Sequence, residues 1–179
     1  MALAKRCNIT VLDEPWRRVS CWLDPREVRS TWLGNKAVYR TRRALAPGAE
    51  LVVLAPGVTQ FGEDPSIDRL IRRHGYRQTD AALAAAAGDP ELAASPGTVA
   101  HLIHGSSEGR FTITYCTDPD RGGLTPEELG AVGYGWRPLA DELDRLGVDA
   151  TTPSGPSLDA GGQPFQHIAR PGLGLWVVR

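Results

Sequence analysis

One uninterrupted apolar run constrains the fold of this chain more than any other feature of its sequence. Residues 50–55 read Glu-Leu-Val-Val-Leu-Ala and follow a Pro-Gly pair at 47–48. A strand that faces solvent on one side alternates polar and apolar residues, whereas a strand buried on both faces is continuously apolar. We therefore predict a parallel strand at 50–55 that is covered on both faces. The loop that follows it, 56–65, lies where ligands of open α/β sheets tend to bind.

Strands and helices are expected to alternate along the whole chain. Capping residues, prolines and 3.6-residue periodicity predict helices at 25–45, 65–74, 79–88, 96–104, 126–130 and 139–146. Further strands are expected at 111–116, 134–136, 148–151, 165–168 and 173–178, a hairpin at 8–12 and 18–23, and a flexible loop at 154–164. This order predicts a layered α/β domain over 1–179, with a mostly parallel or mixed central sheet flanked by helices.

Composition and charge exclude several functional classes. The formal net charge of −1 leaves no electrostatic footprint for nucleic acid, and no apolar run approaches the ~20 residues that span a bilayer. The three cysteines, Cys7, Cys21 and Cys116, form no Cys-x-x-Cys pair. An odd number of cysteines without a signal peptide favours a reducing compartment, so we expect a cytoplasmic protein.

The window 101–110 holds more polar chemistry than any other part of the chain. It contains His101, His104, Ser106, Ser107, Glu108 and Arg110. Lys36 follows Trp32 by four residues and shares its helical face. If the two segments meet, Lys36, Trp32, His104, Ser106, Ser107 and Arg110 could hold a carboxylate and a hydroxyl.

A purely structural interpretation of the same residues is equally open. Histidines at a helix end are favoured by the helix dipole, Arg110 can pair with Glu108, and Lys36 can extend past Trp32 to water. Two histidines are too few for a metal site, and we expect His74 and His167 on the surface or in loops. The chain has no Gly-x-Ser-x-Gly, Walker or Gly-x-Gly-x-x-Gly motif, so it contains no self-contained catalytic set.

Several stretches, in this order and spacing, resemble the C-terminal domain of the nickel-pincer lactate racemase family. They are 32–39 (Trp-Leu-Gly-Asn-Lys-Ala-Val-Tyr), 50–56, 101–115, 124–133 (Leu-Thr-Pro-Glu-Glu-Leu-Gly-Ala-Val-Gly) and 171–176. The resemblance covers most of the chain. It implies a two-domain enzyme that interconverts stereoisomers of 2-hydroxy acids by hydride transfer to and from a nickel pincer nucleotide, with the active site between the domains.

The resemblance also implies which parts this chain supplies. The cofactor-bearing lysine, the nickel-ligating histidine and the acid–base histidines belong to the family's N-terminal domain, which this chain is expected to lack. Lys36 matches a substrate-holding lysine, and Leu33 stands where lactate racemases carry glutamine, which favours a different or bulkier acid.

Three hypotheses follow from the sequence. The chain is the C-terminal half of such a racemase or epimerase, catalytically inactive alone and binding no cofactor by itself. Alternatively it is a sugar-acid (mannonate-like) oxidoreductase, or a non-catalytic binding domain. The first requires an N-terminal racemase domain or subunit as partner and a small 2-hydroxy acid or sugar acid as ligand.

Overall fold

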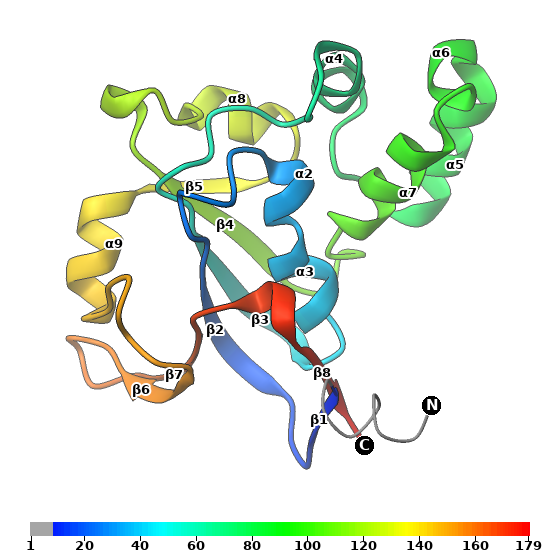
Figure 1. Ribbon diagram of the computed structural model, residues 1–179. Coiled ribbons are helices and arrows are strands. Elements are labelled where there is room, and N and C mark those ends of the chain that lie inside the picture. Colours follow the sequence, from blue (N-terminus) through cyan, green and yellow to red (C-terminus); the bar gives the residue numbers. More distant parts are fainter. Residues whose placement is uncertain (1–8) are drawn as a thin grey trace.

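A six-stranded sheet is the central feature of the computed structural model, which describes residues 9–179 (Figure 1). The strand order is β5-β4-β3-β2-β7-β6, and every neighbouring pair is parallel except β6–β7. The α/β class that the sequence predicts is confirmed. The strands are β2 (Trp16–Trp22), β3 (Leu45–Leu54), β4 (Thr112–Thr117), β5 (Gly135–Pro138), β6 (Gly155–Leu158) and β7 (Pro164–Ile168).

The apolar run is buried on both faces of this sheet, as predicted. Leu51 and Val53 belong to the larger core, together with residues of the helices α3 (Lys36–Thr41) and α7 (Pro96–His104). Val52 and Leu54 belong to a second core beneath α9 (Leu139–Leu146). Successive side chains of a strand point to opposite faces, so one run fills both cores.

The helices that begin at Pro65 and Pro126 start at the caps that the sequence indicates. The Asp64 side chain accepts hydrogen bonds from the backbone N–H groups of Ser66 and Ile67, and Thr125 and Glu128 form a capping box. The predictions at 65–74, 79–88 and 96–104 are confirmed. The first two are α4 (Pro65–His74) and α5 (Thr79–Gly88), and the third is α7. The chain also contains α6 (Pro90–Ala93), α8 (Pro126–Ala131) and the short 3-10 turns η1 (Pro119–Arg121) and η2 (Pro171–Leu173).

The helix predicted at 25–45 is wrong over much of its length. The carbonyl of Asp24 closes a turn by accepting from the N–H groups of Glu27 and Val28. The helical part is limited to α2 (Thr31–Gly34) and α3, and Leu45 already begins β3. Asp-Pro signals a turn as readily as a helix, and the true cap is Ser30, whose hydroxyl accepts from the N–H of Leu33 at 3.3 Å.

The hairpin predicted from 8–12 and 18–23 is also wrong. β1 (Ile9–Leu12) pairs in parallel with β8 (Leu175–Val178) in a separate two-stranded sheet, and Asn8 lies outside the described residues. β2 instead lies between β3 and β7 in the main sheet. A short spacing between two strands does not determine their partners, because β2 buries more apolar surface between two long-range neighbours.

Three expectations for the C-terminal part need correction. Residues 148–151 form a turn rather than a strand, because the Asp149 carboxylate accepts from the N–H of Thr151 at 2.8 Å. The expected loop at 154–164 contains β6, which pairs with β7. His167 is buried within β7, where its Nδ1 lies 2.8 Å from the Ser20 hydroxyl.

A closed ring of ion pairs joins α9 to its face of the sheet. Asp159 lies 2.7 Å from Arg18 and 3.1 Å from Arg145, and Arg137 lies 3.2 Å from Glu142. Contacts of Arg145 with Glu142, Arg137 with Glu50, and Arg18 with Glu50 complete the circuit. The six members, which we call the ion ring, alternate in sign and cancel: Arg18, Glu50, Arg137, Glu142, Arg145 and Asp159.

Candidate functional site

A groove lies beyond the carboxyl ends of the adjacent parallel strands β2 and β7. Its volume is about 610 Å³, and its walls are residues 22–28, 33, 36, 150–151 and 169–173. We call it the Lys36 groove. The loops that follow β2 and β7 supply most of the wall, and the first residue of α3 supplies the lysine. Ligands of open α/β sheets bind at this end of the strands, so the position alone makes the groove a candidate site.

Lys36 is more buried than the other two cations that line the groove, Arg26 and Arg170, both of which are exposed. It is partly buried, and a Cβ added at Gly172 would lie 3.4 Å from its Cδ, so its aliphatic stem packs against η2. Within residues 9–179 its ammonium group has no hydrogen bond or ion pair. Arg26 is exposed and lies 2.6 Å from Asp24, and hydrogen bonding by Arg26 lowers the pKa of Asp24 to about 2. Lys36 is therefore available to an anionic ligand.

The aromatic and histidine side chains that the sequence suggested for the site pack elsewhere. Trp32 stacks on His101 with ring centroids 4.3 Å apart, and His101 Nε2 lies 2.9 Å from the Tyr76 hydroxyl. Burial, with the nearby charge of His104 as a smaller cause, lowers the pKa of His101 to about 3. His104 is exposed and packs on Tyr39 at 5.1 Å. His101 is thus neutral at neutral pH and serves as a packing residue.

A buried polar cluster beside α3 was not anticipated from the sequence. The Oδ1 of Asn35, the residue before Lys36, accepts from the hydroxyls of Tyr115 at 2.7 Å and Tyr134 at 3.0 Å. Tyr134 stacks between Tyr115 and Tyr76, with centroid distances of 5.0 and 4.6 Å. Gly105 is required by close approach, since a Cβ there would lie 2.3 Å from Tyr76 and 2.5 Å from Asn35 Nδ2. We call Asn35 and these three tyrosines the tyrosine cluster. Their spacing in the sequence, from 35 to 134, gives no signal of this contact.

The loop 105–110 is held by its own hydrogen bonds. The Ser106 hydroxyl accepts from the N–H of Glu108 at 2.9 Å, and the Glu108 carboxylate accepts from the Thr79 N–H and hydroxyl at 3.1 and 2.9 Å. Glu108 and Gly109 have positive φ angles of 54° and 68°. Glu108 therefore caps the start of α5. The purely structural interpretation expected Glu108 to pair with Arg110, and that pair is not formed.

Two arginines bind this loop to the start of β3. The guanidinium of Arg110 donates to the carbonyl of Leu45 at 2.8 Å and to that of Arg42 at 3.3 Å. Arg42 donates in return to the carbonyls of Ile103 and His104 at 2.8 and 3.0 Å. Both guanidinium groups therefore donate to backbone carbonyls, those of Arg42 and Leu45 at the start of β3 and those of Ile103 and His104 at the end of α7.

The expected shared cleft of Lys36 and Arg110 is therefore not formed. Arg110 precedes β4 and lies at the amino edge of the parallel sheet, whereas the Lys36 groove lies beyond the carboxyl ends of β2 and β7. The sequence identified the polar residues of both segments but did not show that they lie at opposite edges of the sheet. Of the six predicted residues, the groove includes Lys36 and not Trp32, His104, Ser106, Ser107 or Arg110.

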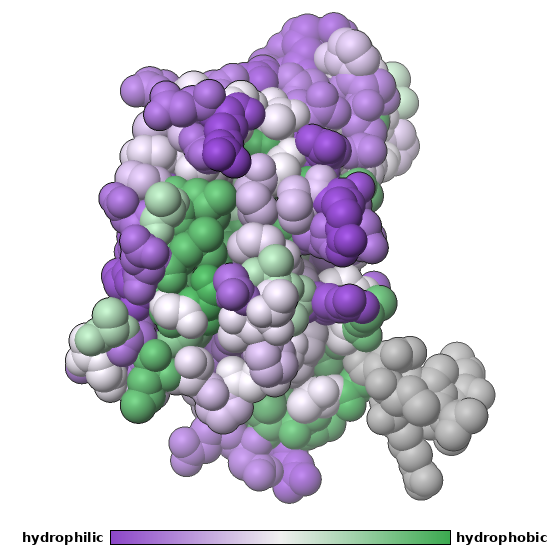
Figure 2. All heavy atoms as spheres, turned by 60° about the vertical axis from the view of Figure 1, so that its left-hand side comes forward, coloured by the Kyte–Doolittle hydropathy of each residue, from purple (hydrophilic) through white to green (hydrophobic). Residues whose placement is uncertain are grey.

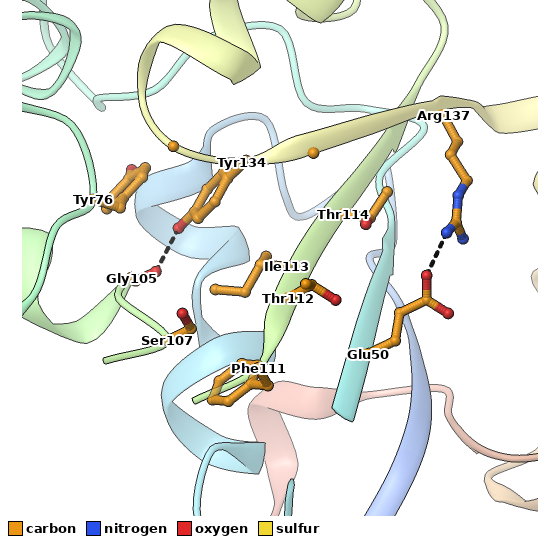
Figure 3. Close-up of a pocket in the computed structure, with 12 residues that line it drawn as sticks. Glu50, Tyr76, Gly105, Ser107, Phe111, Thr112, Ile113, Thr114, Tyr134 and Arg137 are labelled. Atoms are coloured by element: carbon orange, nitrogen blue, oxygen red, sulfur yellow. Dashed lines mark hydrogen bonds and ion pairs between the residues drawn. The ribbon is translucent and has the colours of Figure 1, made fainter. Parts of the chain in front are cut away.

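Ser107 lines a second hollow, beside the amino half of β4 (Figure 3). Its volume is about 400 Å³. It exists because β5 pairs with β4 only from Thr114 onward, which leaves Thr112 and Ile113 without a partner on that side. The charged groups in this hollow are Glu50 and Arg137, which bind each other within the ion ring. The hollow therefore offers a ligand no free charge.

Other candidate sites are not supported by the described residues. The loop 56–65 packs against the chain near Ser30, which bridges to Gln60, and Phe61 is buried. In residues 9–179 there is no group of three or more His, Cys, Asp or Glu side chains that could hold a metal ion. Cys21 and Cys116 are buried and free, and Cys7 lies outside the described residues. None of the helices in this range is long and apolar enough to cross a membrane.

Two solved structures share this fold over nearly the whole chain. A Thermotoga maritima protein from a structural genomics consortium matches 99% of this chain with a TM-score of 0.73 and 18% identity, and 40% of that protein is covered. The lactate racemase apoprotein from Thermoanaerobacterium thermosaccharolyticum matches 99% of this chain with a TM-score of 0.60 and 12% identity, and 39% of it is covered. No protein-family model and no curated protein sequence matches the chain. At these identities the likeness shows the fold, over about two fifths of each structure.

Proposed function

We propose that this chain is the C-terminal, substrate-holding half of a lactate racemase-like 2-hydroxy acid racemase or epimerase. It acts with an N-terminal racemase domain or subunit and is inactive alone. The observation that carries the proposal is the partly buried Lys36, which has no ion pair within residues 9–179 and lies in a groove at the carboxyl ends of β2 and β7. The fold of the lactate racemase apoprotein supports it, because this chain covers 39% of that structure and leaves the remainder to another domain.

The nickel pincer nucleotide of that family does not fit the described residues of this chain. No metal-ligand group occurs in residues 9–179, and His101 is enclosed by Trp32 and Tyr76. In the proposal the partner holds the cofactor, and no chemical step is assigned to this chain.

Lys36 would bind and orient the acid. An ammonium group has three donors, so it can contact one carboxylate oxygen and the neighbouring 2-hydroxyl at once. The partly buried position makes such a charge-assisted contact stronger than on an open surface. Arg110 and His104 have no part in this proposal, because they pack at the other edge of the sheet.

The small number of lysines permits a direct test. The sequence contains only Lys5 and Lys36, so biosynthetic incorporation of lysine labelled with carbon-13 at Cε marks these two side chains and leaves all three N–H donors of each ammonium group in place. Titration with a 2-hydroxy acid should shift the NMR signal of Lys36, assigned with Lys36→Arg, and leave that of Lys5 in place. Lys36→Met should weaken binding about tenfold or more, measured by isothermal titration calorimetry on both chains, the usual loss for a hydrogen bond to a charged group.

Two results would contradict the proposal. One is a Lys36 signal that does not shift with any 2-hydroxy acid up to the solubility limit of that acid. The other is racemisation or oxidation of such an acid by the isolated chain, which would show that no partner is needed.

A further inference from the structure

The walls of the Lys36 groove are mainly carbon. β2 and the loop after it contribute Trp22, Leu23 and Val28, α2 contributes Leu33, and η2 contributes Pro171 and Leu173. Leu173 is 68% exposed, so a large apolar side chain stands uncovered at the rim. Leu33 precedes Lys36 by three residues, which places it beside the lysine on the helical surface. An anion held by Lys36 would therefore meet apolar surface on several sides.

The polar groups of the groove lie at its edge. Arg26 is 84% exposed and is bound to Asp24, and Glu27 and Arg170 are exposed. Thr151 supplies the one neutral hydroxyl among the lining residues, all of which belong to the described part of the chain. A polyhydroxy acid would bury hydroxyls without partners here, and unpaired buried polar groups strongly disfavour binding. A molecule the size of lactate would leave much of the 610 Å³ unfilled.

We infer that the ligand of the Lys36 groove is a 2-hydroxy acid with a branched-alkyl or aryl side chain. Its carboxylate meets Lys36, and its side chain lies between Leu33 and Leu173. This inference rests on the proposed function and restricts its substrate class, separating it from lactate and from sugar acids. Figure 2 shows one face of the molecule, on which hydrophobic surface is bordered by hydrophilic side chains.

Three acids with one carboxylate and one 2-hydroxyl in common test the inference: lactate, 3-phenyllactate and gluconate. Each is titrated into the full chain, and the dissociation constant is taken from the Lys36 Cε signal. We expect 3-phenyllactate to bind at least about tenfold more tightly than the other two, since each buried methylene typically adds several-fold in affinity.

Two variants locate the apolar contact. Leu33→Gln should reduce the preference for 3-phenyllactate about tenfold. Leu173→Gln, at a rim position that carries little risk to folding, should reduce it by a smaller factor. Leu83→Gln on α5 is the matched control, because Leu83 is 52% exposed and does not line the groove; its preference should equal that of the parent chain.

The outcomes separate the two proposals. Equal binding of all three acids, or tightest binding of gluconate, with Lys36 still required, overturns this inference and leaves the proposed function standing. A preference that survives both leucine variants also overturns it. Failure of all three acids to shift the Lys36 signal overturns the proposed function, and this inference falls with it.

Discussion

The two faces of the central sheet bury polar groups in opposite ways. On the face of α2 and α3, the tyrosine cluster is uncharged, and the hydroxyls of Tyr115 and Tyr134 share one side-chain acceptor, Oδ1 of Asn35. On the face of α9, the ion ring distributes three positive and three negative charges around a closed circuit. The tyrosine cluster has one shared side-chain acceptor, whereas each charge of the ion ring has two partners.

This difference bears on the candidate site. Asn35 is adjacent to Lys36 in the chain, so the tyrosine cluster holds the start of α3 and with it the lysine of the groove. The ion ring touches the sheet and α9 and none of the groove's lining residues. We therefore expect damage to the tyrosine cluster to affect both stability and ligand binding, and damage to the ion ring to affect stability alone.

The largest expected effect comes from Asn35→Ala. It removes the acceptor of Tyr115 in a buried environment and leaves Tyr134 only the carbonyl of Gly105 at 2.9 Å, and should lower the free energy of unfolding by about 3 kcal/mol. Urea denaturation measures the loss. Tyr115→Phe, which removes one donor and no acceptor, should cost about 1 kcal/mol. Equal losses for the two variants would refute the convergent role of Asn35.

Acid should reveal the two faces in separate pH ranges. The pKa of His101 falls from 6.5 to about 3 on folding, so the unfolded chain binds a proton first. Its contribution to stability is complete above pH 6.5 and declines below it, by about 2 kcal/mol between pH 8 and pH 5. His104 and His167, whose pKa values burial also lowers, add to the slope. The share of His101 is therefore the difference between the parent chain and His101→Gln.

Glu142 of the ion ring serves as the comparison in the same experiment. Hydrogen bonds and charges of Arg145 and Arg137 outweigh desolvation and lower its pKa. Its contribution is present above the unfolded value near 4.5 and is lost as pH falls through the folded pKa. Glu142→Gln should therefore change the slope of the free energy of unfolding against pH only below about pH 5. A changed slope between pH 8 and pH 5 would contradict this separation.

The smallest effect is expected for Arg110→Met. The variant loses two hydrogen bonds to backbone carbonyls at the start of β3, which should cost about 0.5–1 kcal/mol in thermal or urea unfolding. Binding of a 2-hydroxy acid at the Lys36 groove should not change. A tenfold loss of binding would restore Arg110 to the substrate site that the sequence first suggested.

Local signals predicted local structure well. The caps at Asp64 and Thr125 and the apolar run at 50–55 each determine their element through neighbours in the chain, and those elements are confirmed. The partner of a strand is a long-range property. For this reason the predicted hairpin of β1 and β2 was wrong. The predicted helix at 25–45 was wrong because Gln60, thirty residues away, holds Ser30 in an extended conformation.

The candidate site shows the same limit. Lys36 could be singled out by its position after Trp32 and by family resemblance, but the sequence grouped it with Arg110, which reaches the other edge of the sheet. The wall formed by 169–173 and 150–151 came from segments that carry no polar motif. An apolar groove is assembled from ordinary residues of distant loops, so only the fold reveals it.

The position of β2 has a consequence for how the chain acquires its structure during synthesis. Its partner β7 aligns Val19 with Gln166, so one edge of β2 has no partner until residues 164–168 have been synthesised. Until then that edge presents unpaired backbone groups flanked by apolar side chains, a template for wrong pairing. The buried contact of His167 with Ser20 joins β7 to β2, so the arrival of β7 is the step that completes the pairing of β2.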